Sequence, residues 1–493
     1  MYTRSYTCIQ VLREEQQSTD TSTYRKTFRG GIVMQVHDQW DVIVVGGGTA
    51  GAPAAIAAAR NGAKVLVVEK NGYLGGASTS ALVSPYANHY DAHGEPTIAG
   101  LFKEILDSLK EMGACHGPIR PKEGNPPWGK NPVITPFDDE YLKFVLTKMA
   151  KDAGVSFLYH TLLKDVWVED GVVKGITVFN KSGAHTLFSK VIVDCTGDAD
   201  VAVKAGAKTV KGREKDGEKM PVTVYCRVGN VNVDRVEEEI KRNRDNFRWY
   251  AIGSAEGDLP AGSQRKQLFC SGFWQEIAAA KVNGEYNIGR ETLNLFTNVR
   301  EGEVTVNATR VNFIDGTNAS EVTAAEVELR YQTMSVVDFL RKRVPGFEKS
   351  FLIKTANEAG IRETHRIIGE YILTQEDVVK GTRFDDVVAR GGYAIDIHNP
   401  GDSKSTWIQV DDSYDVPYRA LLPVELEGLL VAGRCISATH EAAAAVRAMP
   451  SCVAIGEAAG TAAALATTRG LTPKTIDVQE LKQVLTQNGV LLA

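Results

Sequence analysis

The sequence predicts an α/β fold with a three-layer domain, built from both ends of the chain around a parallel sheet, and an inserted α+β domain. The first observation is an apolar strand, Val42–Val45, that runs into a glycine-rich turn, an alanine-rich helix and a second strand. The second is a run of short β-rich segments over residues 155–195, and the third is a buried strand followed by a small-residue helix near the C-terminus. Strands and helices that alternate in this way form parallel sheets covered by helices.

The glycine-rich turn predicts a site for an adenine dinucleotide; its residues are Gly46, Gly47, Gly48, Thr49, Ala50 and Gly51. Gly46 permits the tight turn, Gly48 lets a pyrophosphate approach the backbone, and Gly51 lets the helix pack closely on the strand. The start of the helix, with Thr49 and Ala50, presents free N–H groups to the phosphates. Glu69 ends the second strand, where a carboxylate accepts hydrogen bonds from ribose hydroxyls and repels a 2′-phosphate. The alternative is a glycine-rich turn in an ordinary βαβ unit, which this order of strand, helix and glutamate disfavours.

A second glycine pair follows the ribose carboxylate. Beyond Lys70 comes the stretch Leu-Gly-Gly-Ala-Ser-Thr, which contains Gly75, Gly76 and Ser78. Enzymes that bind only a nicotinamide nucleotide need no such turn. The stretch resembles the glutathione-reductase-type FAD-binding fold, in which a Gly-Gly turn lies against the diphosphate and the flavin. The resemblance implies FAD as the cofactor and places these four residues beside it, and a plain loop with two glycines is the alternative.

Length and composition favour a globular protein of two packed domains. The chain has 493 residues, of which 43% are hydrophobic and 24% charged. A net charge of −5 gives no electrostatic footprint for nucleic acid, and we expect no membrane span. Residues 1–36 lack the apolar segment of a secretory signal and are predicted to be a disordered extension, or sequence upstream of a start at Met34.

The cysteines and histidines indicate neither a disulfide framework nor a metal site. The seven cysteines have no C-x-x-C spacing, which argues against a redox-active dithiol. The nine histidines form no H-E-x-x-H pattern or Cys/His cluster. We therefore expect a cytoplasmic protein without a bound metal.

The first domain is predicted to span residues 37–210 and to resume at 386–493. Its helices are expected near residues 101–112 and 138–154, the second with Asp138 as N-cap. Asp170-Gly171 between β-rich runs predicts a hairpin within a β-meander. The next strand ends in Thr196, Gly197 and Asp198, which the resembled fold places close to the cofactor.

The inserted domain is predicted to span residues 211–385 and to cover the flavin as a substrate or cap domain. Residues 221–228 and 303–313 are expected to be strands, and residues 321–343 a long helix that ends before Pro345. Charged stretches at 212–219 and 236–244 are typical of solvated surfaces.

Three further stretches make a family resemblance specific. They are residues 360–371 (GIRETHRIIGEY), 389–400 (ARGGYAIDIHNP) and 432–464 (AGRCISATHE to GTAAA). With the glycine-rich turn, they make the chain similar to the bacterial FAD-dependent oxidoreductases from residue 40 to the C-terminus. The resemblance implies the FAD fold and a flavoenzyme, but not one substrate.

The last of these stretches predicts a second contact with the cofactor. A strand, Leu429–Ala432, ends at Gly433, and a helix starts at Pro450. In the resembled fold the positive end of this helix points at the flavin, so Ser451, Cys452 and Val453 would supply N–H groups. A helix that only packs in the core is the alternative. Many relatives of the wider fold have Asp after this glycine, whereas this chain has Arg434, which could instead face the pyrophosphate.

Three histidines are candidates for a proton acceptor, because oxidation of an alcohol requires a base. His398 follows Asp396, a possible orienting carboxylate, although it could be a plain loop residue. His440 lies between the flavin strand and the flavin helix, but could simply cap a helix with Glu441. His365 has helical spacing from Arg362 and Arg366, a cluster that could hold an anionic substrate or form a helix-face salt-bridge network with Glu363 and Glu370.

The sequence thus predicts an enzyme that exchanges a hydride between a C–H bond of a small organic substrate, of the alcohol or CH–CH type, and flavin N5. An NAD(P)H-dependent flavin reductase is one alternative, but no second G-x-G-x-x-G follows a strand. A non-catalytic flavoprotein or electron carrier is the other. The substrate, the direction of the reaction, the electron acceptor and the oligomeric state do not follow from the sequence.

Overall fold

A computed structural model describes residues 25–27, 33–91, 93–127, 132–402, 405–410 and 412–492. The predicted disordered extension, residues 1–36, lies largely outside the described residues. Its described part differs from that prediction, because strand β1 (Arg25–Thr27) pairs with the start of strand β2 (Val33–Val45).

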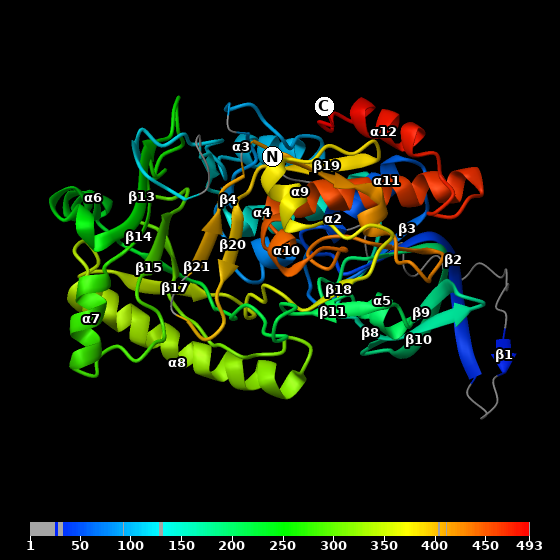
Figure 1. Ribbon diagram of the computed structural model, residues 1–493, viewed down its shortest axis with the longest axis horizontal. Coiled ribbons are helices and arrows are strands. Elements are labelled where there is room, and N and C mark those ends of the chain that lie inside the picture. The colour runs from blue at the N-terminus through cyan, green and yellow to red at the C-terminus, as the bar shows by residue number, and fades with distance from the viewer. Residues whose placement is uncertain are drawn as a thin grey trace, which may run out of the picture.

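The first sheet has eight strands and a parallel core (Figure 1). The parallel neighbours run in the order β7, β3, β2, β10, β23, and β8 and β9 extend β10 as an antiparallel meander. The bounds are β3 Val65–Val68, β7 Ser156–Leu158, β8 Leu162–Glu169, β9 Val172–Asn180, β10 Gly183–Asp194 and β23 Leu429–Val431. Asp170 and Gly171 have φ of 49° and 76° at the turn between β8 and β9, which confirms the predicted hairpin.

Alternation along the strands gives this domain its three layers. Val42 and Val44 of β2 pack with the helices on one face, while Ile43 and Val45 pack with the meander and α5 (Asp200–Lys204) on the other. The helical layer consists of α2 (Gly51–Arg60), α3 (Leu101–Glu111), α4 (Asp139–Asp152), α10 (His440–Val446), α11 (Met449–Arg469) and α12 (Val478–Gln487). Asp138 caps α4 by accepting hydrogen bonds from two backbone N–H groups, which confirms the predicted N-cap.

Helices α2 and α11 are in direct backbone contact. A Cβ atom added to Gly456 would lie 2.0 Å from the Ala50 carbonyl oxygen, and one added to Gly460 would lie 2.0 Å from that of Ala54. Contrary to the expectation from sequence, α11 has the length and apolarity of a membrane span. Its apolar window is wholly buried among the described residues, as in core helices of globular proteins.

The second sheet has seven strands in the order β17, β12, β16, β15, β14, β13, β5, all antiparallel. Figure 1 shows it on the left, beside helices α6, α7 and α8. The bounds are β5 Glu123–Gly124, β12 Cys226–Gly229, β13 Phe247–Ser254, β14 Lys266–Gly272, β15 Leu293–Thr297, β16 Val304–Asn307, β17 Phe351–Thr355, α6 Val233–Arg242, α7 Trp274–Val282 and α8 Ala319–Arg343.

The limits of the two cores differ from the predicted domain limits. Strand β5 comes from the first predicted segment yet pairs with β13 in the second sheet. Leu373 and Val378 belong to the hydrophobic core of the first sheet, although the cap domain was predicted to continue to residue 385. These residues follow a strand, β18 (His365–Ile367), that has already returned to pair with β11 (Thr209–Lys211).

Short elements connect the two sheets. They are β4 Tyr86–Ala87, β6 Ile134–Thr135, α9 Gln375–Lys380, β19 Val387–Gly391, β20 Ile395–His398, β21 Ser405–Ile408 and β22 Tyr414–Pro417. Among them, β20 and β21 form a hairpin next to the second sheet.

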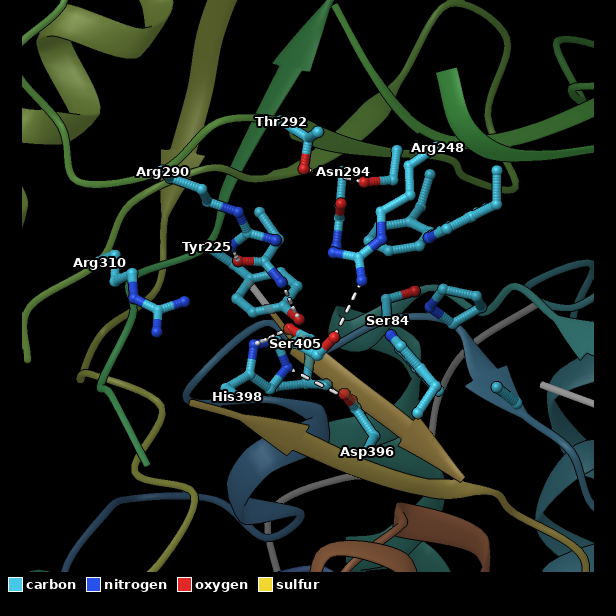
Figure 2. Close-up of a pocket in the computed structure, with 18 of the residues that line it drawn as sticks. Ser84, Tyr225, Arg248, Arg290, Thr292, Asn294, Arg310, Asp396, His398 and Ser405 are labelled. Atoms are coloured by element: carbon cyan, nitrogen blue, oxygen red, sulfur yellow. Dashed lines mark hydrogen bonds and ion pairs between the residues drawn. The ribbon is translucent and has the colours of Figure 1, made fainter. Parts of the chain in front are cut away.

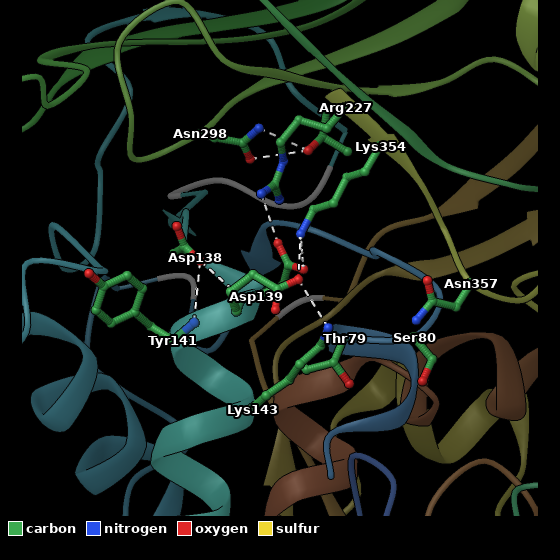
Figure 3. Close-up of polar contacts among 12 residues, drawn as sticks. Thr79, Ser80, Asp138, Asp139, Tyr141, Lys143, Arg227, Asn298, Lys354 and Asn357 are labelled. Atoms are coloured by element: carbon green, nitrogen blue, oxygen red, sulfur yellow. Dashed lines mark hydrogen bonds and ion pairs between the residues drawn. The ribbon is translucent and has the colours of Figure 1, made fainter. Parts of the chain in front are cut away.

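A buried ionic cluster joins the start of α4 to the second sheet (Figure 3). Arg227 on β12 lies 2.8 Å from an Asp139 carboxylate oxygen, and their side chains are only 4% and 2% exposed. The Lys354 ammonium group on β17 contacts the other Asp139 oxygen at 2.6 Å. Separating such a pair would leave a buried charge without a partner, which is costly. The cluster therefore fixes the position of helix α4 against the second sheet.

Replacing Arg227 with Leu should lower the free energy of unfolding by about 3 kcal/mol, because Asp139 would keep only the Lys354 charge in a buried position. The matched control is Arg235→Leu, whose partner Glu348 is 2.8 Å away but whose pair is about half exposed. We expect a change of about 1 kcal/mol or less for the control. Chemical denaturation of both variants checks this, and equal effects would contradict a special role of the buried pair.

Candidate FAD and substrate site

Three glycine-containing segments converge at the carboxyl end of the first sheet. Gly46 has φ +91° and sits where a Cβ would lie 2.6 Å from the Cys195 carbonyl oxygen. Gly76 has φ +52°, and its Cβ would lie 2.8 Å from the Gly48 Cα. Gly433, with φ +93°, faces Ala50. Only residues without a side chain allow the loops to approach so closely.

The start of helix α2 is free to bind an anion. Its N-cap position, Ala50, makes no side-chain capping bond, so no capping side chain occupies the positive end of the helix dipole. Thr49 donates its hydroxyl to the Gly75 carbonyl oxygen at 3.1 Å, which ties the second glycine pair to the turn. A Cβ on Gly48 would meet only the Gly76 Cα at 3.8 Å, so the space before this residue is open. This geometry fits a pyrophosphate.

Glu69 is buried beside the turn with both oxygens engaged. They accept hydrogen bonds from the Gly47 N–H at 2.7 Å and from the Asn71 N–H at 2.8 Å. Burial raises the pKa of Glu69, although these two hydrogen bonds act to lower it. Each carboxylate oxygen retains a second lone pair, so the residue fits the predicted contact with a ribose. Lys70 is paired with Glu358 at 2.5 Å.

Asp198 and Arg434 form an ion pair of 2.6 Å at the ends of β10 and β23. Thr364 donates its hydroxyl to the same Asp198 oxygen at 2.7 Å. A Cβ on Gly197 would lie 3.0 Å from the Arg434 Nε, so the guanidinium passes directly over this glycine. Thr196 accepts the Asp200 N–H at 2.9 Å and thus shapes the loop into α5. The predicted contact of Arg434 with pyrophosphate therefore competes with its internal pair.

Helix α11 begins at Met449, one residue before the predicted start, which shifts its free N–H groups. The Cys452 N–H donates to the Ala448 carbonyl oxygen at 2.9 Å and is the first internal bond. The prediction that Cys452 and Val453 offer free N–H groups is therefore wrong, because both lie beyond the first three helical positions. Pro450 has no N–H, so Met449 and Ser451 are the donors of this turn.

The other predicted contact near α11 is Ser78. It is buried, and its hydroxyl donates to the Met449 sulfur at 3.1 Å while accepting from the Tyr86 hydroxyl at 3.4 Å. Ser78 therefore fixes the loop after the second glycine pair against the start of α11.

His440 is the first residue of α10 and is held by a buried carboxylate. Its Nδ1 lies 2.8 Å from Glu363 Oε1, which also pairs with Arg366. The Nε2 atom is buried without a hydrogen-bond partner among the described residues. Thr439, and not His440, caps the helix.

Arg362 and His365 do not share a helix face, because residues 365–367 form strand β18. The predicted cluster is wrong at this point: alternation along a strand sends neighbouring side chains to opposite faces. His365 contacts the Thr209 hydroxyl at 2.8 Å through Nδ1, away from Arg366, which is buried with Glu363. Arg362 is partly buried and donates to the Pro221 carbonyl oxygen at 2.5 Å.

A cavity of about 130 Å³ separates the hairpin β20–β21 from the second sheet (Figure 2). The polar and charged residues in its wall are Ser84, Tyr225, Arg248, Ser271, Arg290, Thr292, Asn294, Asn307, Arg310, Tyr393, Asp396, His398 and Ser405. Asp396 and His398 alternate with Ile395 and Ile397, which face the hydrophobic core, so both polar side chains reach the cavity.

His398 lies between two partners in this wall. Its Nε2 is 3.3 Å from Asp396 Oδ2, and its Nδ1 is 3.2 Å from the Ser405 hydroxyl. Burial, together with the positive charge of Arg362, lowers the pKa of His398 to about 3, against the opposing influence of Asp396. The imidazole is therefore neutral at ordinary pH, with a lone pair to accept a proton.

The cavity is connected to the start of α11 through Arg447. This residue donates to the Asp396 carbonyl oxygen at 2.8 Å and lies 3.8 Å from the Asp396 carboxylate. It stands two residues before Met449, so the wall that holds His398 is tied to the helix end predicted to face the flavin. Of the predicted catalytic residues, His398 lines the cavity and Arg362 acts on it electrostatically.

The cavity arginines were not predicted. Arg248, Arg290 and Arg310 occur singly in the middle segment, without a motif. They become neighbours only when strands far apart in the sequence pair in the second sheet.

The six described cysteines are free and buried, and Cys8 lies outside the described residues. No group of three or more metal-ligating side chains occurs in the part of the chain that the structure describes.

Comparison with known proteins bears on the cofactor. A family model described as "FAD dependent oxidoreductase" matches residues 41–485. A digeranylgeranylglycerophospholipid reductase of Sulfolobus acidocaldarius is 29% identical over 163 residues, 32% of this chain and 34% of that protein, so the match spans about a third of its length. A thiamine thiazole synthase of Methanococcus aeolicus is 27% identical over 207 residues, 40% of this chain and 69% of that protein.

A solved structure is also similar to this chain over most of its length. A geranylgeranyl bacteriochlorophyll reductase-like protein from Thermoplasma acidophilum matches 91% of this chain and 84% of its own, with 16% identity and a TM-score of 0.46.

Replacing Gly48 with Ala should weaken FAD binding at least tenfold, because the methyl group would enter the space in front of α2. The fold should persist, since the new Cβ meets only one atom, at an ordinary distance of 3.8 Å. Gly289→Ala, which meets nothing within 4 Å, is the control. FAD fluorescence titration and circular dichroism measure the two properties. A Gly48→Ala protein that binds FAD normally would refute this placement of the pyrophosphate.

Proposed function

Because the chain belongs to the family of FAD-dependent oxidoreductases, we propose that it exchanges a hydride between a C–H bond of a small organic molecule and FAD. The substrate is of the alcohol or CH–CH type. The observation that carries the proposal is the Asp396–His398 pair in the wall of a cavity that Arg447 ties to the start of α11. The predicted cytoplasmic location is part of the proposal and is supported by the free, buried cysteines.

Bound FAD supplies a hydride acceptor at its N5 atom. Gly46, Gly48 and the start of α2 would hold its pyrophosphate, Glu69 its ribose, and the first turn of α11 would face its flavin. The chain's own side chains then have two tasks: to hold the substrate in the cavity and to take the proton of its hydroxyl group.

His398 is the proposed base. Its Nε2–H donates to Asp396, which fixes the ring and leaves the lone pair on Nδ1. Nδ1 is next to the Ser405 hydroxyl, so the proton reaches it either directly from the substrate or through Ser405. Asp396 stabilises the imidazolium that forms, as the carboxylate of a triad does.

Anaerobic mixing tests the reaction class. Loss of the yellow colour with organic substrates, and not with NAD(P)H alone, is the expected outcome. Bleaching by NAD(P)H alone would make the protein a flavin reductase, and no bleaching by either would make it an electron carrier. A purified protein that is colourless and takes up no FAD would remove the basis of the proposal.

His398→Ala should slow flavin reduction by an alcohol substrate by about 10²- to 10⁴-fold, because the hydroxyl proton loses its acceptor. Substrate affinity, measured from the concentration dependence of the stopped-flow rate, should change much less. Ser405→Ala shows whether the proton passes through the serine. An unchanged reduction rate in His398→Ala would exclude this histidine as the base.

The low pKa of His398 should also determine how the rate of flavin reduction depends on pH. With the pKa of His398 lowered to about 3, the base is already neutral at pH 5. The second-order rate constant for flavin reduction should therefore show no acid limb near the usual histidine pKa of about 6.5. Stopped-flow measurements from pH 5 to 8 check this. A limb near 6.5 that vanishes in His398→Ala would mean that the ring has an ordinary pKa.

A further inference from the structure

Three arginines face the cavity: Arg248 on strand β13, Arg290 in the loop before β15 and Arg310 in the loop after β16. Figure 2 shows Arg248 and Arg290 above the cavity and His398 with Asp396 on strand β20 below it, with Arg310 to the side. Arg290 and Arg310 are buried, with only 7% and 6% of their surface exposed. Three positive charges at one wall are an unusual lining for a cavity that binds a neutral molecule.

These guanidinium groups have neutral partners. Arg290 donates to the Asn307 side-chain oxygen at 2.8 Å. Arg310 donates to the Asn312 side-chain oxygen at 2.9 Å and to the Asn399 carbonyl oxygen. Arg248 donates to the Ser405 carbonyl oxygen at 2.9 Å. Among the residues that the structure describes, no carboxylate oxygen lies within 4 Å of any of the three.

The acidic groups nearby do not cancel this charge. Burial and the repulsion of Arg290 lower the pKa of Arg310 to about 10, and they outweigh the charge of Asp402, which acts to raise that pKa. Asp396 is already engaged with His398 and Arg447. Counting the charged residues of the wall, three arginines against one aspartate leave an excess of +2, although Arg248 is exposed and its charge is screened by water. The two buried guanidinium groups have no carboxylate partner, and buried charge without a counter-ion is costly, so the cavity favours an anion. The exposed Arg248 offers a contact for a second anionic group at the mouth of the cavity.

The cavity also has hydrogen-bond acceptors without partners. The Asn294 side-chain oxygen, the Ser84 hydroxyl oxygen and one Asp396 oxygen are buried and make no hydrogen bond among the described residues. All three residues line the cavity. Buried acceptors are normally satisfied, so the missing partner is expected to bring a donor such as a hydroxyl group.

The volume of the cavity further limits which class of substrate can bind. At about 130 Å³, the cavity is well below the roughly 300–1,000 Å³ of pockets for drug-sized ligands. A long isoprenoid or a polycyclic substrate has no room in it. A compact molecule of a few carbon atoms fits.

We propose that the substrate is a small hydroxy dicarboxylate, whose carboxylates bind Arg248, Arg290 and Arg310 and whose hydroxyl group is oxidised. The proposal rests on the function proposed above. With FAD bound as the hydride acceptor, the hydroxyl proton would go to His398, the carbinol carbon would lose a hydride to the cofactor, and the alcohol would become a carbonyl group. Both electrons pass to the cofactor, so a single turnover needs no further oxidant.

The negative charge of such a substrate would also raise the basicity of His398. Arg362 and Arg290 disfavour a proton on His398 in the free protein. A dianion between the arginines offsets these charges, so that His398 becomes a stronger base only when the substrate is present.

Binding tests the substrate class without turnover. The FAD-loaded protein is titrated with succinate, which lacks the hydroxyl group, and with butane-1,4-diol, its neutral counterpart. Calorimetry and the flavin absorption spectrum report binding. We expect succinate to bind at least tenfold more tightly than the diol, and the difference to shrink with added salt.

Arg290→Gln and Arg310→Gln should each weaken succinate binding at least tenfold, and Arg290→Lys should weaken it less because the charge remains. Arg343→Gln, which removes an exposed arginine paired with Glu285, is the matched control and should bind succinate normally. Retained FAD absorbance shows that each variant is folded. Succinate binding that is no tighter than diol binding, or that is unchanged in Arg290→Gln and Arg310→Gln, overturns the proposal.

Reduction of the bound flavin distinguishes the dicarboxylate site from the hydride-transfer function proposed above. Anaerobic D- or L-malate is expected to bleach the flavin. If a neutral alcohol bleaches it while succinate does not bind, the dicarboxylate proposal fails and the oxidoreductase function stands. If succinate binds through the arginines but no hydroxy acid or alcohol bleaches the flavin, the anion site stands and the hydride-transfer function fails.

Discussion

The backbone contact between α2 and α11 is the constraint on which the site depends. One helix starts near residue 51 and the other near residue 449, and they cross where Gly456 and Gly460 face the carbonyl oxygens of Ala50 and Ala54. Their N-termini consequently lie at the same edge of the sheet. Because Gly456 faces Ala50, α11 extends about two turns beyond the start of α2, so the two positive helix ends are offset along this edge and suit different anionic parts of one extended nucleotide.

The region of the second sheet supplies side chains that can recognise a substrate, which the glycine loops of the first sheet lack. The first sheet ends in glycine loops and backbone donors, which suit phosphates but distinguish poorly among substrates. The cavity lies where the hairpin β20–β21 meets the second sheet, and its wall combines a histidine from one with arginines from the other. The buried Arg227–Asp139 pair also joins helix α4 of the first domain to the second sheet.

Burial governs the chemistry of the cavity more than any single contact. It lowers the pKa of His398 and of Arg310, and so keeps the imidazole neutral while the guanidinium stays charged at ordinary pH. A neutral base thus faces uncompensated cations. This distribution favours an anionic ligand that carries its own proton to give, and it makes proton acceptance dependent on ligand charge.

The sequence by itself determined the fold class and the cofactor, because strand, glycine turn and helix are contiguous and each glycine has a local steric reason. The hairpin at Asp170-Gly171 and the Asp138 cap were predictable for the same reason. Local patterns failed where strand pairing overrode them: the spacing of His365 from Arg362 suggested a helix, but residues 365–367 form a strand that pairs with β11. Only the tertiary structure decided which side chains surround the substrate, since Arg248, Arg290 and Arg310 are brought together with His398 by strand pairings that no local motif records.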